Sequence, residues 1–257
     1  MVQHRRTRGT LGGMPNPTAA ALVIGDEILS GRTRDANTHH LAGELTRIGV
    51  DLREVRVVPD VHEMIVAALD ALRSTYTYVF TSGGIGPTHD DITADAVAAA
   101  FGVGIGVRED ARALMEEAFA SRGTAVTDEQ LRMARIPDGA ALIVNDVSGA
   151  PGFRLGNVHV LAGVPKIFVA MLETVLPTLE TGSPLRSREV RFEVGESRVS
   201  ASLRDLAEQM PDLSFGSYPF SDGEIRGTNV VVRGTDENRL AKAVARLEVL
   251  RSAVPGR

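Results

Sequence analysis

Short runs of apolar and β-branched residues alternate with longer amphipathic stretches from Ala19 onward. This alternation is typical of βαβ units, in which helices connect parallel strands. The pattern predicts strands at 20–24, 52–58, 76–81, 140–145 and 158–162 and helices at 36–48, 63–73, 93–101, 108–121 and 167–176. Joined by right-handed crossovers, these elements predict an α/β fold, a three-layer sandwich with a mostly parallel sheet over 18–180.

A second, smaller unit follows a linker at 181–187. The linker contains Thr181-Gly182-Ser183-Pro184, a short polar stretch rich in helix and strand breakers. Beyond it the pattern predicts strands at 188–194, 213–218 and 225–233 and helices at 199–209 and 236–250. This βαββα order predicts a small α+β domain over 188–257.

The first 17 residues contain scarcely an apolar side chain, so we expect a flexible tail, with Met14 as an alternative start. No signal peptide and no apolar run near ~18 residues is seen, which predicts a cytoplasmic protein without a membrane partner. A net charge of −5 and 4% aromatic residues without Trp argue against nucleic acid as a partner. The absence of Cys excludes disulfides and thiolate chemistry.

Polar residues follow three of the predicted parallel strands directly. These are Gly25-Asp26-Glu27, Pro59-Asp60 and the loop from Thr81 to Asp91. Because ligands of open parallel sheets bind beyond the carboxyl ends of the strands, we expect the three segments to form one site.

The loop Ser82-Gly83-Gly84-Ile85-Gly86-Pro87-Thr88 suits an anion, since glycines let backbone N–H groups approach a phosphate. The predicted phosphate-binding residues are Thr81, Ser82, Gly83, Gly84, Gly86 and Thr88, and a side chain at Gly84 should block the cradle. The alternative is a tight turn with Asp91 as an ordinary helix cap. Neither a Walker lysine nor a dinucleotide fingerprint is present.

Three carboxylates belong to the same predicted site: Asp26, Asp60 and Asp91. Together they would attract Mg²⁺ or another divalent cation to a bound phosphate, with Asp60 and Asp91 as the catalytic candidates. Asp60 as a simple helix cap and Glu27 in a solvated loop are the alternatives.

Several motifs resemble the molybdopterin-binding family of the MoaB/Mog type, and most of all the amino-terminal part of competence/damage-inducible protein A (CinA). The resembling segments are 25–31 (GDEILSG), Asp35-x-Asn37, 58–60, 81–93 (TSGGIGPTHDDIT), 145–153 and 161–165. The resemblance implies that the glycine loop holds a pterin phosphate, that Asp60 and Asp91 match aspartates important in Mog-type relatives, and that Asp26 and Asn37 contact the ligand.

Two departures from the family pattern are visible. Ala162 and Ile167 stand where relatives often have Pro and Glu, so a role for that glutamate is not expected here. The resemblance also ends before the CinA deamidase domain, and nicotinamide-mononucleotide deamidation is therefore not expected.

Three functions remain open at this point. The first is a molybdopterin-binding protein of molybdenum cofactor biosynthesis, as carrier or adenylyltransferase. The second is a metal-dependent pyrophosphatase that cleaves ADP-ribose or FAD to AMP. The third is a non-catalytic ligand-binding module. The relatives imply a homo-oligomer, a dimer or a trimer, in each case.

Overall fold

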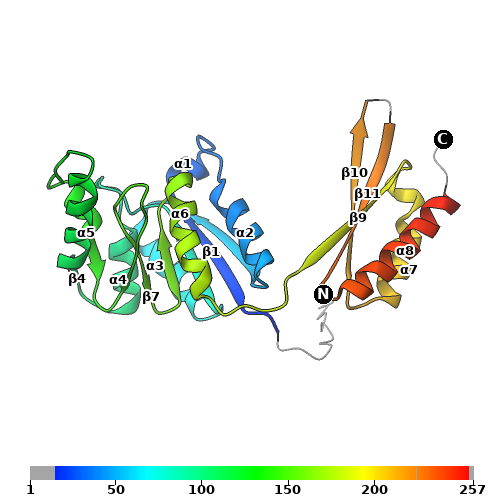
Figure 1. The fold of residues 1–257 in the computed structure, drawn as a ribbon, viewed down its shortest axis with the longest axis horizontal. Helices are drawn as coiled ribbons and strands as arrows, with labels where there is room; N and C mark the ends of the chain where they lie inside the picture. Colours follow the sequence, from blue (N-terminus) through cyan, green and yellow to red (C-terminus); the bar gives the residue numbers. More distant parts are fainter. Residues whose placement is uncertain (1–14, 224, 255–257) are drawn as a thin grey trace. The chain divides into compact units, whose positions relative to one another are not determined.

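The computed structural model of the 257-residue chain describes residues 15–223 and 225–254. They belong to two compact units, Asn16–Gly182 and a second one that begins at Ser183. The predicted tail lies outside the described residues up to Met14. Figure 1 shows both units, with labels on many of their elements.

The first unit is built on a six-stranded sheet in the order β2-β1-β3-β8-β7-β6. Its strands are β1 (Thr18–Ile24), β2 (Asp51–Val58), β3 (Tyr78–Ser82), β6 (Ala141–Ile143), β7 (Gly152–Leu155) and β8 (Val158–Leu161). β1 is parallel to β2 and β3, and β3 is parallel to β8, whereas β7 is antiparallel to both of its neighbours. The mostly parallel sheet is confirmed.

Helices cover both faces of this sheet, which gives three layers (Figure 1). On one face lie α3 (His62–Arg73), α4 (Thr93–Phe101) and α5 (Glu109–Ala120), whose buried side chains share a core with Leu22 and Val160. On the other face α2 (Asn37–Arg47) and α6 (Pro165–Val175) pack over Ala21 and Phe80. Successive residues of a strand therefore point alternately into the two cores. This is why the strands are continuous apolar runs in the sequence.

Several short elements complete this unit. They are α1 (Asp26–Leu29), the antiparallel pair β4 (Ile105–Val107) and β5 (Arg135–Pro137), and the 3₁₀ turns η1 (Gln130–Ala134) and η2 (Leu176–Thr178). The sequence pattern did not predict them, because elements of three to five residues are too short to show a period.

The second unit is a small α+β domain. Its antiparallel sheet has the order β10-β11-β9, with β9 (Arg186–Phe192), β10 (Ser214–Asp222) and β11 (Ile225–Gly234). The 3₁₀ turn η3 (Glu196–Arg198) and the helices α7 (Ser200–Gln209) and α8 (Glu237–Ala253) complete it. Side chains of both helices share a core with Phe192 and Val230. Within the described ranges of the chain, no helix is long and apolar enough to cross a membrane.

Candidate functional site

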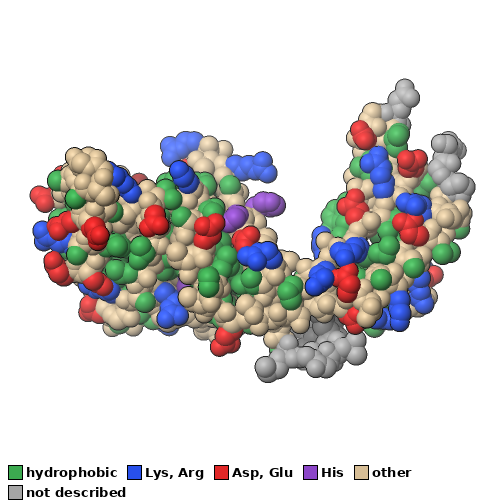
Figure 2. All heavy atoms as spheres, in the orientation of Figure 1, with side chains coloured by type: hydrophobic (Ala, Val, Ile, Leu, Met, Phe, Trp, Pro, Cys, Tyr) green, Lys and Arg blue, Asp and Glu red, His purple; other side chains and the backbone are tan. Residues whose placement is uncertain are grey.

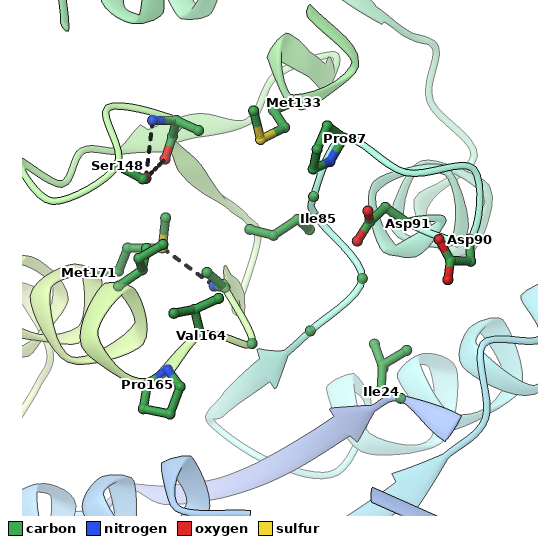
Figure 3. Close-up of a pocket in the computed structure, with 18 of the residues that line it drawn as sticks. Ile24, Ile85, Pro87, Asp90, Asp91, Met133, Ser148, Val164, Pro165 and Met171 are labelled. Atoms are coloured by element: carbon green, nitrogen blue, oxygen red, sulfur yellow. Dashed lines mark hydrogen bonds between the residues drawn. The ribbon is translucent and has the colours of Figure 1, made fainter. Parts of the chain in front are cut away.

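A cavity of about 550 Å³ opens where β1, β3 and β8 end, at the edge that the strand order predicts for a ligand. Its wall is mixed in character. The acidic lining residues are Glu27, Asp60, Asp90 and Asp91, and the larger apolar ones include Ile24, Ile85, Phe119, Met133 and Met171. Figure 3 shows Ile85 pointing into the space between Met133, Ser148, Met171 and Val164, while Asp90 and Asp91 lie on the other side of the loop.

The glycine loop owes its conformation to close backbone packing. Gly83 and Gly84 have φ values of 108° and 68°, a region that side chains rarely allow. A Cβ at Gly83 would lie 2.2 Å from the Ile24 carbonyl oxygen, and one at Gly84 would lie 2.1 Å from Thr93 Oγ1. The prediction that a side chain at Gly84 blocks the cradle stays a prediction, and such a side chain would also collide with the start of α4.

The same loop leaves backbone donors available. Among the residues that the structure describes, no acceptor contacts the N–H groups of Gly84, Ile85 and Gly86, and all three residues line the cavity. Unpaired amides at a glycine turn form an anion-binding concavity. This part of the site suits a phosphate or carboxylate group.

The hydroxyl-bearing candidates do not line the cavity. Thr81 is fully buried, and its Oγ1 has no partner within the described part of the chain. Ser82 Oγ accepts a hydrogen bond from Asn37 Nδ2 at 2.8 Å, and the same Nδ2 donates to the Gly163 carbonyl at 2.7 Å. Thr88 donates through both its N–H and its hydroxyl to Asp91 Oδ2, at 2.8 and 2.5 Å. These contacts make Ser82, Asn37 and Thr88 parts of the framework around the site.

Asp60 is a cavity carboxylate whose surroundings raise its pKa. Its half-buried carboxylate accepts a hydrogen bond from the Asp26 N–H at 3.0 Å. Burial raises the pKa of Asp60 above its ordinary value, the Asp26 N–H opposes this shift, and the negative charges of Asp26, Glu27 and Asp90 add to it. Positive charge brought near Asp60 would therefore be stabilised.

The predicted three-carboxylate metal site is not preformed. In residues 15–223 and 225–254, no group of three or more His, Asp or Glu side chains is arranged to hold a metal ion. Asp26 approaches Asp60 through its backbone, and Asp91 is bonded to Thr88. Mg²⁺ commonly uses only one or two carboxylates and completes its shell with substrate phosphate and water. Asp60, with one acidic neighbour, fits that kind of binding.

Unpaired cationic side chains occur in the segments that contribute to the same cavity. Within the described part of the first unit, five Lys or Arg side chains form neither an ion pair nor a hydrogen bond: Arg32, Arg34, Arg132, Arg154 and Lys166. All but Arg154 are next to residues that line the cavity, namely Thr33, Met133 and Pro165. Arg132 also lines a small crevice behind the glycine loop. Figure 2 shows Lys and Arg side chains over the segment between α1 and α2.

The cavity is also lined by residues that the sequence did not single out, among them Phe119, Met133, Ser148 and Pro151. Ser148 lies in a half-buried turn in which Asn145 Oδ1 accepts hydrogen bonds from the Val147 and Ser148 N–H groups at 3.1 and 2.8 Å. The resembling segment 145–153 was the available signal for this turn. Met133 lies in η1, and no sequence motif marks that segment.

Comparison with known proteins adds two family matches. Residues 20–181 match a family described as a probable molybdopterin binding domain. Residues 184–253 match one described as the middle domain of FAD synthase. The two matches meet near the junction of the two compact units.

Individual proteins are similar to this chain over much of its length. A protein of Pyrobaculum calidifontis is 37% identical across 79% of this chain and 81% of its own length. A probable FAD synthase of Caenorhabditis elegans is 31% identical across 91% of this chain, which corresponds to 50% of that longer protein. The solved structure of CinA from Thermoplasma acidophilum, whose function is described as unknown, has a TM-score of 0.58 and 34% identity and covers 63% of this chain and 97% of its own.

Proposed function

Because this chain belongs to the molybdopterin-binding family of the MoaB/Mog type and is CinA-like, we propose that its cavity binds a small phosphorylated ligand with a flat ring, either a nucleotide or a pterin. The unpaired amides of Gly84, Ile85 and Gly86 would receive a phosphate group. Arg132, exposed beside this loop, would contribute a charge-assisted hydrogen bond. The apolar wall with Phe119, Met133 and Met171 offers a surface for the ring.

We further propose that the protein cleaves a phosphate–phosphate bond, as in ADP-ribose or FAD, to release AMP. The observation that carries this proposal is the position of Asp60, a half-buried carboxylate with raised pKa in the wall that also contains the glycine loop. A divalent cation, when bound, would supply positive charge to the phosphate oxygens and to a water molecule. Asp60 would hold that cation, together with Asp26 or Glu27.

The remaining steps fall to residues of the chain itself. The loop amides would orient the phosphate and stabilise the charge that develops on its oxygens. Water adds to one phosphorus, the bridging oxygen leaves with the other phosphate group, and the proton released by the water passes to a nearby carboxylate. Asp91 is a candidate for this proton transfer, since it lines the cavity and Thr88 fixes its carboxylate.

The experiment is to measure AMP release from ADP-ribose and from FAD by the purified full-length chain, with Mg²⁺ or with a chelator. We expect metal-dependent AMP from at least one of them, and a loss of at least ~100-fold in Asp60→Asn. Asp70→Asn, an exposed position on α3, is the matched control. AMP release that is insensitive to both the chelator and Asp60→Asn would contradict the role of Asp60.

A second candidate, molybdopterin binding without diphosphate cleavage, is favoured by the match over residues 20–181. It uses the same loop and apolar wall but does not need Asp60 for turnover. If no AMP appears with any metal while a pterin phosphate binds, this second function replaces the first.

A further inference from the structure

Strand β2 forms an open edge of the large sheet. It pairs with β1 and, among the described strands, with no other. Val55 and Val57 on this strand are 43% and 39% exposed, although both are β-branched apolar residues. An exposed edge strand with apolar side chains is a template for pairing with another chain.

The usual protection of an edge strand is weak here. No proline interrupts Asp51–Val58. Its charged side chains are already neutralised within the chain, Arg53 by Asp51 at 2.6 Å and Arg56 by Glu54 at 2.5 Å. A shift in the pairing with β1 at Ala19/Ala20 marks a bulge near Arg53, which leaves the strand regular from Glu54 to Val58.

The backbone direction determines which residues can pair outward. The Val58 carbonyl accepts a hydrogen bond from the Gly25 N–H, so it faces the β1 side. Because this direction alternates along a strand, the polar backbone groups of Val57 and Val55 face away from β1. A second strand would therefore form its hydrogen bonds with these two valines.

Only a few symmetric antiparallel registers satisfy that requirement within the regular part of the strand. Centring a two-fold axis on Glu54 or Arg56 would place like charges opposite each other. Centring it on Val55 places valine against valine and Glu54 opposite Arg56 of the partner subunit. This last register is self-complementary in both charge and apolar contact.

We propose that β2 is an interface with a second copy of this chain, in which the two strands pair antiparallel around Val55. The sheets of the two copies then become continuous across this edge. The interface involves neither the glycine loop nor Asp60, so it stands independently of the proposed function.

The absence of Cys from the natural sequence makes the test direct. Val55→Cys places one thiol per chain next to the axis, where strand pairing brings the two Cα atoms within disulfide range. Mild oxidation of the full-length variant should give a covalent species of twice the 27.4 kDa chain mass on a non-reducing gel. Val249→Cys, 72% exposed on α8, is the control that should stay at the mass of one chain.

Reversing charges on β2 provides a second test, in which analytical ultracentrifugation measures dimerisation. Glu54→Arg places like charges opposite each other and should weaken dimerisation at least tenfold, while the double variant Glu54→Arg with Arg56→Glu should restore it. The proposal is overturned if the wild-type chain is monomeric at micromolar concentration, or if it associates equally with and without these changes. Equal cross-linking of the Val55→Cys and Val249→Cys variants would also overturn it.

Discussion

At the scale of single residues, His159 shows how a buried polar group can shape the response to pH. This side chain on β8 is 2% exposed and stacks on Phe80 with ring centres 5.0 Å apart, and Tyr78 meets it edge-on. Neither ring nitrogen has a hydrogen-bond partner in the described structure. Burial, and then the charge of Arg154, lowers the pKa of His159 to about 4.

This shift predicts a loss of stability in acid. The unfolded chain binds the His159 proton more readily than the folded one, so stability should fall as the pH drops below about 6.5 and level off below about 4. The total penalty is on the order of 3 kcal/mol. Chemical denaturation at pH 7 and at pH 4 measures this loss. The free energy of unfolding should fall less between these two pH values in His159→Leu than in the wild type. His39→Leu, a change at an exposed position on α2, is the control and should lose as much stability in acid as the wild type. If His159→Leu also loses as much stability as the wild type, buried His159 is not the cause.

At the scale of elements, Asn37 connects three parts of the site. Through one amide it holds the first turn of α2, the end of β3 and the segment before α6, since Nδ2 donates to Ser82 Oγ and the Gly163 carbonyl. Asn37 is 5% exposed, so these bonds are not exchanged with water. The glycine loop follows Ser82 directly, so its position depends on these two hydrogen bonds of Asn37.

We therefore expect Asn37→Ala to destabilise the protein and weaken ligand binding together. Losing two buried hydrogen bonds should lower the free energy of unfolding by about 2–3 kcal/mol. Denaturant titration of the full-length chain measures this, with Thr38→Ala, the next residue on the same helix, as the control. Equal free energies of unfolding of the two variants would show that the Asn37 hydrogen bonds do not hold these elements together.

The elements also show what the sequence can and cannot predict. Long helices such as α3 and α4 lie within a residue of their predicted bounds, because their apolar spacing repeats over three turns. Strand β7 was not predicted, since its run of four residues is too short to show a period. The Gly156-Asn157 turn that joins it to β8, with Gly156 at φ 56°, was the hairpin signal to use.

The candidate site follows the same logic. Glycine spacing and strand order place Gly83, Gly84, Gly86, Asp60 and Asp91 at one cavity. They cannot show that Thr81 faces a core or that Asn37 bonds to Ser82, because side-chain direction depends on packing between elements far apart in sequence. Nor could sequence spacing show that Met133 and Ser148 complete the wall.

At the scale of the whole molecule, the features that suit a phosphorylated ligand all belong to the first unit, Asn16–Gly182. The second unit matches the middle domain of FAD synthase. Among the residues that the structure describes, those that line the cavity belong to the first unit. Phosphate recognition at the glycine loop is therefore separate from both catalysis and strand pairing at β2.

Phosphate recognition is tested most directly by calorimetric titration of the full-length chain with ADP-ribose and with adenosine, in the presence of a chelator that prevents turnover. We predict that ADP-ribose binds at least ~30-fold more tightly, about 2 kcal/mol, and that Arg132→Ala weakens its binding about tenfold. Arg154→Ala, the unpaired cation that lines a different cavity, should leave the affinity unchanged. Equal affinities for ADP-ribose and adenosine, or equal effects of the two arginine variants, would contradict phosphate recognition at this loop.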